Sequence, residues 1–200
     1  ASDVYKRQPQ PLFQAANARK YLEFVHPLNK TDRINYDEIK APESYLIHAL
    51  PDLLSAWIAA NFTASPVFHV CAVLIRNFLI RFRGGSPVTR IMANVQTDVL
   101  DIIIFKDSVL QFCNSFYYSN HTDLLYYLLF VIEQLKISTE DLSLYLSGAV
   151  ESKSELIKLL NSYIRYVDLI PESSGKDFGL LPDMLPQHRY FDLLNVSLCV

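Results

Sequence analysis

Converging acidic side chains can hold the two metal ions of a phosphodiester-cleaving site. In two-metal nucleases built on a mixed sheet, one of these acids lies in the first strand. Residues 91–95, which open the clearest strand pattern of this chain, read Ile-Met-Ala-Asn-Val and include no acid. Asp101, Glu133 and Asp141 would need a different geometry to replace it. The sequence therefore argues against nuclease activity.

The sequence also contains a serine followed by a distant histidine, Ser147 and His188, a pattern that occurs in hydrolases. No nucleophile-elbow sequence surrounds Ser147. The five histidines show no metal-ligand spacing. His48 and His69 lie in apolar segments that look like strands, so we expect core or sheet-edge positions with satisfied hydrogen bonds. We therefore predict no catalytic residue and no metal site.

The basic residues form one local cluster, Arg76, Arg81, Arg83 and Arg90. These side chains could bind an acidic partner or a phosphate, but such charges more often complement a helix C-terminus and stay solvated. Over the whole chain the formal net charge is −3 and the pI is about 5.9. The chain thus lacks the overall basic field of a general nucleic-acid binder, and we expect no nucleic-acid partner.

Composition indicates a folded protein, since half of the 200 residues are hydrophobic and 20% are charged. Three scattered cysteines, Cys71, Cys113 and Cys199, are typical of reduced thiols and indicate a cytoplasmic location. The longest apolar runs, such as 124–132, are about half the ~18 residues that a membrane span needs, so we expect no transmembrane segment. Because the chain opens without Met, we expect a fragment of a longer protein, with residues 1–8 as candidate foreign sequence.

The clearest structural pattern is a run of three apolar segments, 91–95, 99–105 and 109–117, divided by the polar breaks 96–98 and 106–108. Short segments with tight polar breaks predict a three-stranded antiparallel meander. Part of the aromatic run Phe116-Tyr117-Tyr118 must then be exposed near a sheet edge, where it could contact another protein.

Helix and strand patterns alternate after the meander. Asn120 and Asp123 look like the cap of a helix that runs to about Lys136, and a capping box at 152–155 opens a second helix. Strands are expected at 142–146 and 166–170, and a last helix from Pro186. This β-β-β-α-β-α-β-α order predicts an α/β fold, the actin-like or ribonuclease-H-like lobe. Its mixed five-stranded sheet has helices on both faces, and the two later strands are parallel to the first.

The chain before the meander resembles the end of another lobe. Its patterns predict a helix at 14–25, strands at 34–37 and 45–49, a helix from Pro51, a strand at 66–69 and a helix at 71–83. Gly84-Gly85-Ser86-Pro87 is the strongest break. We therefore expect an incomplete first actin-like lobe at 1–83 that lacks its N-terminal strands, a linker at 84–89 and a second lobe at 90–200.

The chain also resembles domain-of-unknown-function family 3822, an uncharacterised bacterial family grouped with the actin-like ATPases. The resemblance extends over roughly residues 11–200 and depends on the order and spacing of several short motifs. These are Asn17 to Leu22, Asn94-Val95, Asp101 to Ile104, Phe112 to Phe116, Leu125 to Phe130, Leu144 to Gly148 and His188 to Cys199. Scaffold proteins of type IV pili and type II secretion are more distant relatives by fold. Membership implies a fold, whereas function must be argued from sites.

The resemblance implies two turns of a nucleotide site in the second lobe, one that faces the phosphates and one that faces the adenosine. Actin-like ATPases bind phosphates with glycine-rich hairpin turns, because glycine lets backbone amides approach the anion closely. The corresponding turn here is Gln96-Thr97-Asp98, without glycine, in which Thr97 and Asp98 could contact phosphate or Mg²⁺. On the adenosine side, Ser147-Gly148-Ala149 keeps one of the usual two glycines. The alternative for both is an ordinary structural turn.

Two functions of different classes remain. The first is a non-catalytic scaffold or interaction module with a degenerate nucleotide site, acting through a protein partner or self-association. The absence of glycine from residues 96–98 favours it. The second is an ATP-binding or ATP-hydrolysing switch that uses ATP and Mg²⁺, in which closure of two lobes changes a partner surface.

Overall fold

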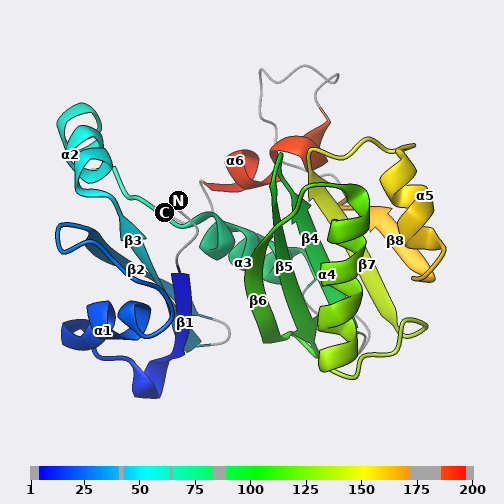
Figure 1. Cartoon of the computed structure of the whole chain (residues 1–200), viewed down its shortest axis with the longest axis horizontal. Helices are drawn as coiled ribbons and strands as arrows, with labels where there is room; N and C mark the ends of the chain where they lie inside the picture. Colours follow the sequence, from blue (N-terminus) through cyan, green and yellow to red (C-terminus); the bar gives the residue numbers. More distant parts are fainter. Residues whose placement is uncertain (1–4, 41–42, 64, 83–88, 172–185, 197–200) are drawn as a thin grey trace. The chain divides into compact units, whose positions relative to one another are not determined.

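The computed structural model describes residues 5–40, 43–63, 65–82, 89–171 and 186–196 (Figure 1). The chain divides into two compact units between Asn77 and Phe78, inside helix α3 (Val70–Arg81). The expected linker at 84–89 lies outside the described residues except for Thr89. The assignment of the two units as actin-like lobes with those boundaries stays a prediction.

The first unit is built on an antiparallel sheet in the order β1-β3-β2. Its strands are β1 (Tyr5–Pro9), β2 (Arg33–Lys40) and β3 (Glu43–Leu50). The structure confirms the two strands expected at 34–37 and 45–49. Strand β1 was not expected, and its pairing with β3 brings residues 5–8, the candidate foreign sequence, into the sheet.

Helix α1 (Ala18–Glu23) covers one face of this sheet. It is shorter than the helix expected at 14–25, because a 3-10 turn at Ala15–Asn17 precedes it. A further 3-10 turn occupies Gln10–Leu12. Ala18 and Leu22 of α1 form a core cluster with buried residues of β3. The apolar face expected for this helix is therefore present.

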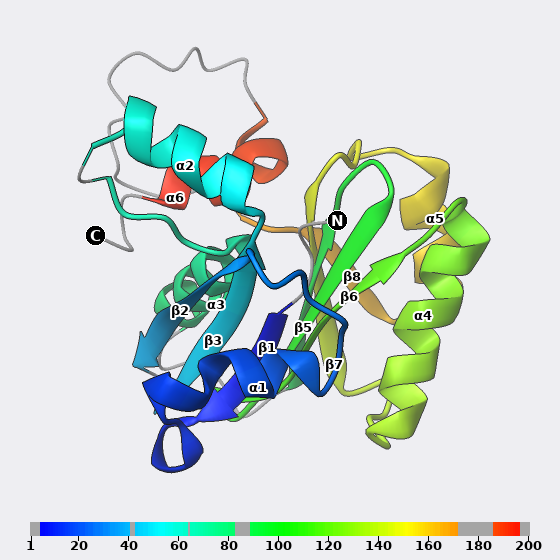
Figure 2. The same cartoon turned by 60° about the vertical axis from the view of Figure 1, so that its left-hand side comes forward.

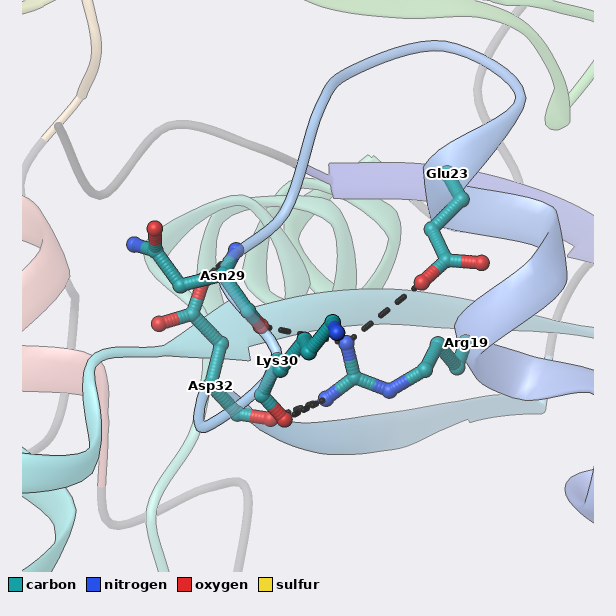
Figure 3. Close-up of polar contacts among 5 residues, drawn as sticks. All are labelled: Arg19, Glu23, Asn29, Lys30 and Asp32. Atoms are coloured by element: carbon teal, nitrogen blue, oxygen red, sulfur yellow. Dashed lines mark hydrogen bonds and ion pairs between the residues drawn. The ribbon is translucent and has the colours of Figure 1, made fainter.

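Arg19 of α1 holds the loop that leads into β2 (Figure 3). Its guanidinium donates to the carbonyl oxygens of Asn29, at 3.2 Å, of Lys30, at 3.4 Å, and of Asp32. The same guanidinium lies 3.5 Å from the Glu23 carboxylate. Several backbone carbonyls thus share one charged donor, which fixes where β2 begins.

Two helices follow the sheet, α2 (Asp52–Asn61) and α3. The strand expected at 66–69 is absent from the structure. Pro66 has no N–H to donate, and the His69 amide donates to the Asp37 carboxylate at 2.8 Å instead of to a strand. This segment is therefore an irregular lead into α3.

The second unit has the predicted mixed five-stranded sheet, in the order β6-β5-β4-β7-β8. The strands β4, β5 and β6 form the antiparallel meander, and β7 and β8 join parallel to β4. The elements in chain order are β4 (Thr89–Val95), β5 (Val99–Lys106), β6 (Val109–Tyr117), α4 (His121–Gln134), β7 (Leu142–Gly148), α5 (Glu155–Asn161), β8 (Tyr166–Leu169), a 3-10 turn (Gln187–Tyr190) and α6 (Phe191–Asn195). The expected fold and element order are confirmed.

The caps of α4 and α5 differ from each other. Asn120 caps α4 as expected, since its side chain accepts from the Asp123 amide at 2.9 Å and the Asp123 carboxylate accepts from the Ser119 amide at 3.0 Å. The expected capping box at 152–155 is wrong. Helix α5 begins one residue after Ser154, whose side chain makes no capping hydrogen bond. Of the two serines before this helix, Ser152 and Ser154, the second directly precedes its first residue, Glu155.

Helices lie on both faces of the five-stranded sheet. Alternate residues of β4, β5 and β7 pack with α4 and α5 in one large core, and α4 and α5 lie on the same side of the sheet in Figures 1 and 2. Residues between them point to the opposite face. There Phe78 of α3 stacks on Phe105 of β5, with 5.3 Å between ring centroids. This opposite face carries the polar residues described below.

Candidate functional site

The four residues expected to contact nucleotide lie at one end of the second unit's sheet, where the inner strands β4 and β7 finish. Val95, the last residue of β4, pairs directly with Gly148, the last residue of the parallel strand β7. The turn with Thr97 and Asp98 follows β4, so it lies beside Ser147 and Gly148. Ligands bind outside the carboxyl ends of parallel strands in open α/β sheets. The structure thus brings the predicted residues together where a ligand would be expected.

The backbone of the turn at 96–98 is hydrogen-bonded within the protein. The Gln96 amide donates to the Val99 carbonyl at 2.9 Å, and the Tyr118 amide donates to the Asp98 carbonyl at 3.0 Å. The Tyr118 hydroxyl donates to the Gln96 carbonyl, and burial, followed by the charge of Asp98, raises the pKa of that hydroxyl. Thr97 and Asp98 themselves are exposed. The Gln96 amide therefore already has a hydrogen-bond acceptor within the hairpin.

Gly148 has a structural reason to be glycine. Its φ is +85°, and a Cβ atom there would lie 2.2 Å from the Val95 carbonyl oxygen. The next amide, that of Ala149, donates to the same oxygen at 2.7 Å. The space left by the missing side chain is thus filled by the protein's own backbone. Neither this amide nor that of Gln96 is free to hold a phosphate in this arrangement.

A buried row of polar side chains crosses four strands beside this edge, and sequence reasoning missed it. Ser147 Oγ donates to Asn94 Oδ1 at 2.9 Å, and Asn94 Nδ2 donates to Asp101 Oδ2 at 3.0 Å. Ser115 Oγ donates to Asp101 Oδ1 at 2.6 Å. Ser147, Asn94 and Asp101 are at most 3% exposed. We call these four residues the polar row.

The polar row depends on strand register. Asn94 is the direct partner of both Asp101 and Ser147, and Asp101 is the direct partner of Ser115. All four alternate with residues of the large core, so they share the face opposite α4. In the sequence these residues appear only as single polar residues inside apolar strands. That they contact one another follows from the register of the strands, which no local sequence pattern gives.

The hydrolase pattern is not assembled. Ser147 Oγ is fully buried in the polar row, and His188 Nε2 lies 2.8 Å from the Val150 carbonyl oxygen. The serine hydroxyl therefore donates to Asn94 rather than to this histidine. A nucleophile needs a base within hydrogen-bond reach and access to a substrate. This arrangement provides neither.

The acidic candidates do not converge either. Asp101 faces away from α4, whereas Glu133 is exposed on α4 and Asp141 precedes the amino end of β7. Among the described residues, no group of three or more His, Cys, Asp or Glu side chains could hold a metal ion. Asp141 lines a cavity of about 930 Å³ at the amino ends of β4, β7 and β8. That cavity is at the opposite end of the strands from Gly148.

The first unit buries a second carboxylate, Asp37, beside His48. Asp37 Oδ2 lies 3.6 Å from His48 Nδ1, beyond hydrogen-bond distance. Burial raises the pKa of Asp37 to about 6, and burial lowers the pKa of His48 to about 4. Neither ring nitrogen of His48 has a hydrogen-bond partner within the described part of the chain. The expectation of satisfied histidines is thus wrong for His48, whereas His69 Nδ1 accepts from the Cys71 amide at 3.2 Å.

The arginines of the expected basic cluster have separate roles. Arg76 donates to the Glu38 carbonyl, and Arg81 donates to the Pro171 carbonyl. The Arg90 guanidinium lies over the Phe82 ring, 5.4 Å from its centroid. Arg83 lies outside the described residues. The described arginines contact backbone carbonyls and aromatic rings of the protein itself.

The aromatic run at the end of β6 is partly exposed, as expected. Tyr117 is exposed on this edge strand, whereas Phe116 is half-buried and stacks on Tyr127 of α4, with 4.9 Å between ring centroids. In the described part of the chain, no helix is both long and apolar enough to cross a membrane.

Solved structures with the same arrangement define the class of fold. A protein from Bacteroides thetaiotaomicron, described as having an actin-like ATPase fold and unknown function, superposes with a TM-score of 0.84 at 22% identity, over all of this chain and 71% of that one. The PilM-PilN type IV pilus biogenesis complex superposes with a TM-score of 0.68 at 9% identity, over 98% of this chain and 76% of that one. The chain has an actin-like ATPase fold.

Residues 2–167 match the family described as Protein of unknown function (DUF3822), and the chain belongs to this family. The expected family is therefore confirmed, although the match ends at residue 167 and does not include the expected motif at His188 to Cys199. No curated protein sequence matches the chain. Family and fold are thus established, whereas activity has to be inferred from the site.

Proposed function

We propose that this protein is a non-catalytic scaffold or interaction module of actin-like fold whose nucleotide site is degenerate. The observation that carries the proposal is the pairing of two backbone amides. The Gln96 and Ala149 amides, which belong to the expected phosphate-facing turn and the expected adenosine-side turn, donate to the Val99 and Val95 carbonyls. Phosphoryl transfer depends on positioning and charge stabilisation, so the loss of such donors should be severe.

The proposed partner is another protein or a second copy of the chain, and the proposed location is the cytoplasm. Support for a protein partner comes from the solved neighbour described as the PilM-PilN complex, which is an assembly of proteins, and from exposed Tyr117. The three cysteines are scattered along the sequence, which favours a reducing compartment. The net charge of −3 favours a partner other than nucleic acid.

An ATP-binding or ATP-hydrolysing switch is the second candidate. Exposed Thr97 and Asp98 beside Gly148 favour it, because they stand at the carboxyl edge of the parallel strands. In this reading Thr97, Asp98, Ser147 and Gly148 contact ATP and its Mg²⁺. The four assignments stay predictions.

The two candidates are separated by titrating the purified protein with ATP and Mg²⁺ by calorimetry, together with phosphate release. We expect no turnover above the no-enzyme background. The informative variant is Asp98→Ala, and Asp141→Ala, an exposed acid at the other end of the sheet, is its control. Turnover in the parent that Asp98→Ala abolishes and Asp141→Ala preserves would refute the scaffold proposal.

A further inference from the structure

Helix α3 belongs to both units of the chain. The boundary between the units lies between Asn77 and Phe78, so the helix begins in the first unit and ends in the second. In the second unit Phe78 stacks on Phe105. In the first unit Arg76 ties the helix to β2 by donating to the Glu38 carbonyl. A change at the amino end of α3 therefore acts on a helix that both units share.

His69 is the N-cap residue of α3. Its carbonyl oxygen accepts from the Ala72 amide at 2.9 Å and from the Val73 amide at 3.3 Å, the first hydrogen bonds of the helix. Its ring nitrogen Nδ1 accepts from the Cys71 amide at 3.2 Å. The side chain thus satisfies a first-turn amide that the helix itself leaves without an acceptor. Serine, threonine, asparagine or aspartate usually provides this acceptor, and none of them gains a proton near neutral pH.

A histidine cap requires a neutral ring. In the imidazolium both ring nitrogens carry a hydrogen, so Nδ1 of His69 would direct a donor at the donor of the Cys71 amide. The positive charge would also lie at the positive end of the helix dipole. Histidine is the side chain whose charge ordinarily changes between about pH 5 and 8. A proton on His69 Nδ1 is therefore incompatible with the hydrogen bond from Cys71.

Asp37 supplies a second contact at this end of the helix. Its Oδ2 accepts from the His69 amide at 2.8 Å, so β2 holds the residue that caps α3. Burial raises the pKa of Asp37 to about 6, although the His69 hydrogen bond and the charge of Arg76 act in the opposite direction. As pH falls through about 6, the carboxylate becomes neutral in the range in which histidine gains a proton. The negative charge beside His69 is then lost.

The other groups around His69 cannot balance a proton on its ring. The buried His48 ring of β3 has its centroid 5.3 Å from that of His69, and it is neutral near pH 6 because burial lowers its pKa to about 4. The Tyr5 ring of β1 lies 4.7 Å from His69, and strand alternation places Arg7 on the same face as Tyr5. Arg7 and Arg76 are positive. An imidazolium at His69 thus has no counter-charge among these groups once Asp37 is neutral.

We propose that the amino end of α3 is a pH-sensitive joint: below neutral pH, His69 gains a proton, its hydrogen bond from the Cys71 amide breaks, and the first turn of α3 opens while β2 and β3 stay paired. The two hydrogen bonds that carry this inference join β2, His69 and the first turn of α3, and neither involves residues 5–8. The inference goes beyond the proposed interaction role and does not involve the turn at 96–98.

The test is amide hydrogen exchange of the 200-residue chain, resolved to single residues by NMR and corrected for intrinsic exchange rates. It compares about pH 7.5 with about pH 5, which bracket the ordinary titration of histidine. Each pH unit below the ordinary histidine pKa of about 6.5 can change such an opening equilibrium up to about tenfold. We therefore expect the protection of the Cys71, Ala72 and Val73 amides to fall at least about tenfold. The amides of β3 should keep their protection.

Two histidine variants make the test specific. Asparagine is a favoured N-cap that does not titrate, so His69→Asn should hold the protection of the first turn within about twofold between the two pH values. His69→Ser is a second cap of the same kind. His26 is exposed and follows α1, so His26→Asn is the matched control and should show the same loss as the parent. Circular dichroism at both pH values shows whether the variants are folded.

Three results would overturn the proposal. One is equal protection of the first turn of α3 at both pH values in the parent, a measurement that needs no variant. Another is the same loss in His69→Asn or His69→Ser as in the parent, because the titrating group would then lie elsewhere. The third is a parallel loss throughout β2 and β3, which would mean that the first unit unfolds as a whole instead of opening at the joint.

Discussion

Among the described residues each unit buries one carboxylate, and the two carboxylates differ in how their hydrogen bonds are satisfied. Asp101 in the second unit is 3% exposed and accepts hydrogen bonds from Asn94 and Ser115. Asp37 in the first unit is 6% exposed, accepts from the His69 amide and lies near His48 without bonding to it. Burying a charge is costly unless hydrogen bonds replace water. The comparison shows that strand register supplies those bonds at Asp101, whereas at Asp37 the burial cost appears as a raised pKa.

Removing the better-satisfied carboxylate should have the largest effect. Asp101→Ala leaves Asn94 Nδ2 as a buried donor and Ser115 Oγ as a part-buried donor without this acceptor, so we expect the free energy of unfolding to fall by roughly 3 to 5 kcal/mol. Asp101→Asn keeps the volume and one acceptor and should cost less. Chemical denaturation followed by circular dichroism measures both. A cost below about 1 kcal/mol for Asp101→Ala would show that the polar row contributes little to stability.

The less-satisfied pair should respond to pH. Burial raises the pKa of Asp37 from 3.8 to about 6 and lowers that of His48 from 6.5 to about 4. Asp37 therefore contributes stability at low pH that is lost as pH rises to 6. His48 contributes stability above pH 6.5 that is lost as pH falls to 4. In the parent protein the two contributions oppose each other between pH 4 and 6.

Single substitutions should separate the two contributions. Asp37→Asn should lose about 2 to 3 kcal/mol of stability as pH falls from 6.5 to 4, and His48→Gln a similar amount as pH rises from 4 to 6. Urea unfolding followed by fluorescence of Trp57, the one tryptophan of the sequence, reports on the first unit. Parallel pH profiles for the parent and both variants would contradict the assignment.

The smallest expected effect is at one end of the polar row. Ser115→Ala removes the donor 2.6 Å from Asp101 and leaves Asn94 in place, so we expect a loss of about 1 to 2 kcal/mol. Ser143→Ala, a strand serine of the same sheet outside the row, is the matched control and should cost less. Equal losses in the two variants would mean that the row adds nothing at Ser115. Thermal unfolding of both proteins in one buffer provides the comparison.

The sequence predicted the parts of the fold that depend on local patterns. Tight polar breaks at 96–98 and 106–108 specified the meander, and the alternation of helix and strand patterns after it specified the parallel strands. Strand β1 was missed because Tyr5–Pro9 has no apolar alternation and becomes a strand by pairing with β3. The segment from Pro66 to His69 was misassigned because Pro66 has no N–H to donate and the His69 amide donates to Asp37.

The four residues of the candidate site were named from the sequence, whereas the hydrogen bonds around them were not; their contact with nucleotide stays a prediction. Thr97, Asp98, Ser147 and Gly148 do lie at one sheet edge, because the ends of parallel neighbours meet there. The bonding of Asn94, Asp101 and Ser115 could not be predicted, because it requires residues from three strands to be in register. For the same reason, the internal pairing of the Gln96 and Ala149 amides was not apparent from the residue types.

Gly148 makes a single position of this chain informative about other members of its family. A methyl group there would overlap the Val95 carbonyl oxygen, which belongs to the neighbouring strand. A family member with alanine at this position must separate the ends of its two strands or turn that oxygen away. Either change would release the bond from the Ala149 amide and leave a donor at the sheet edge. We therefore predict that family members with another residue at this position arrange the ends of these two strands differently.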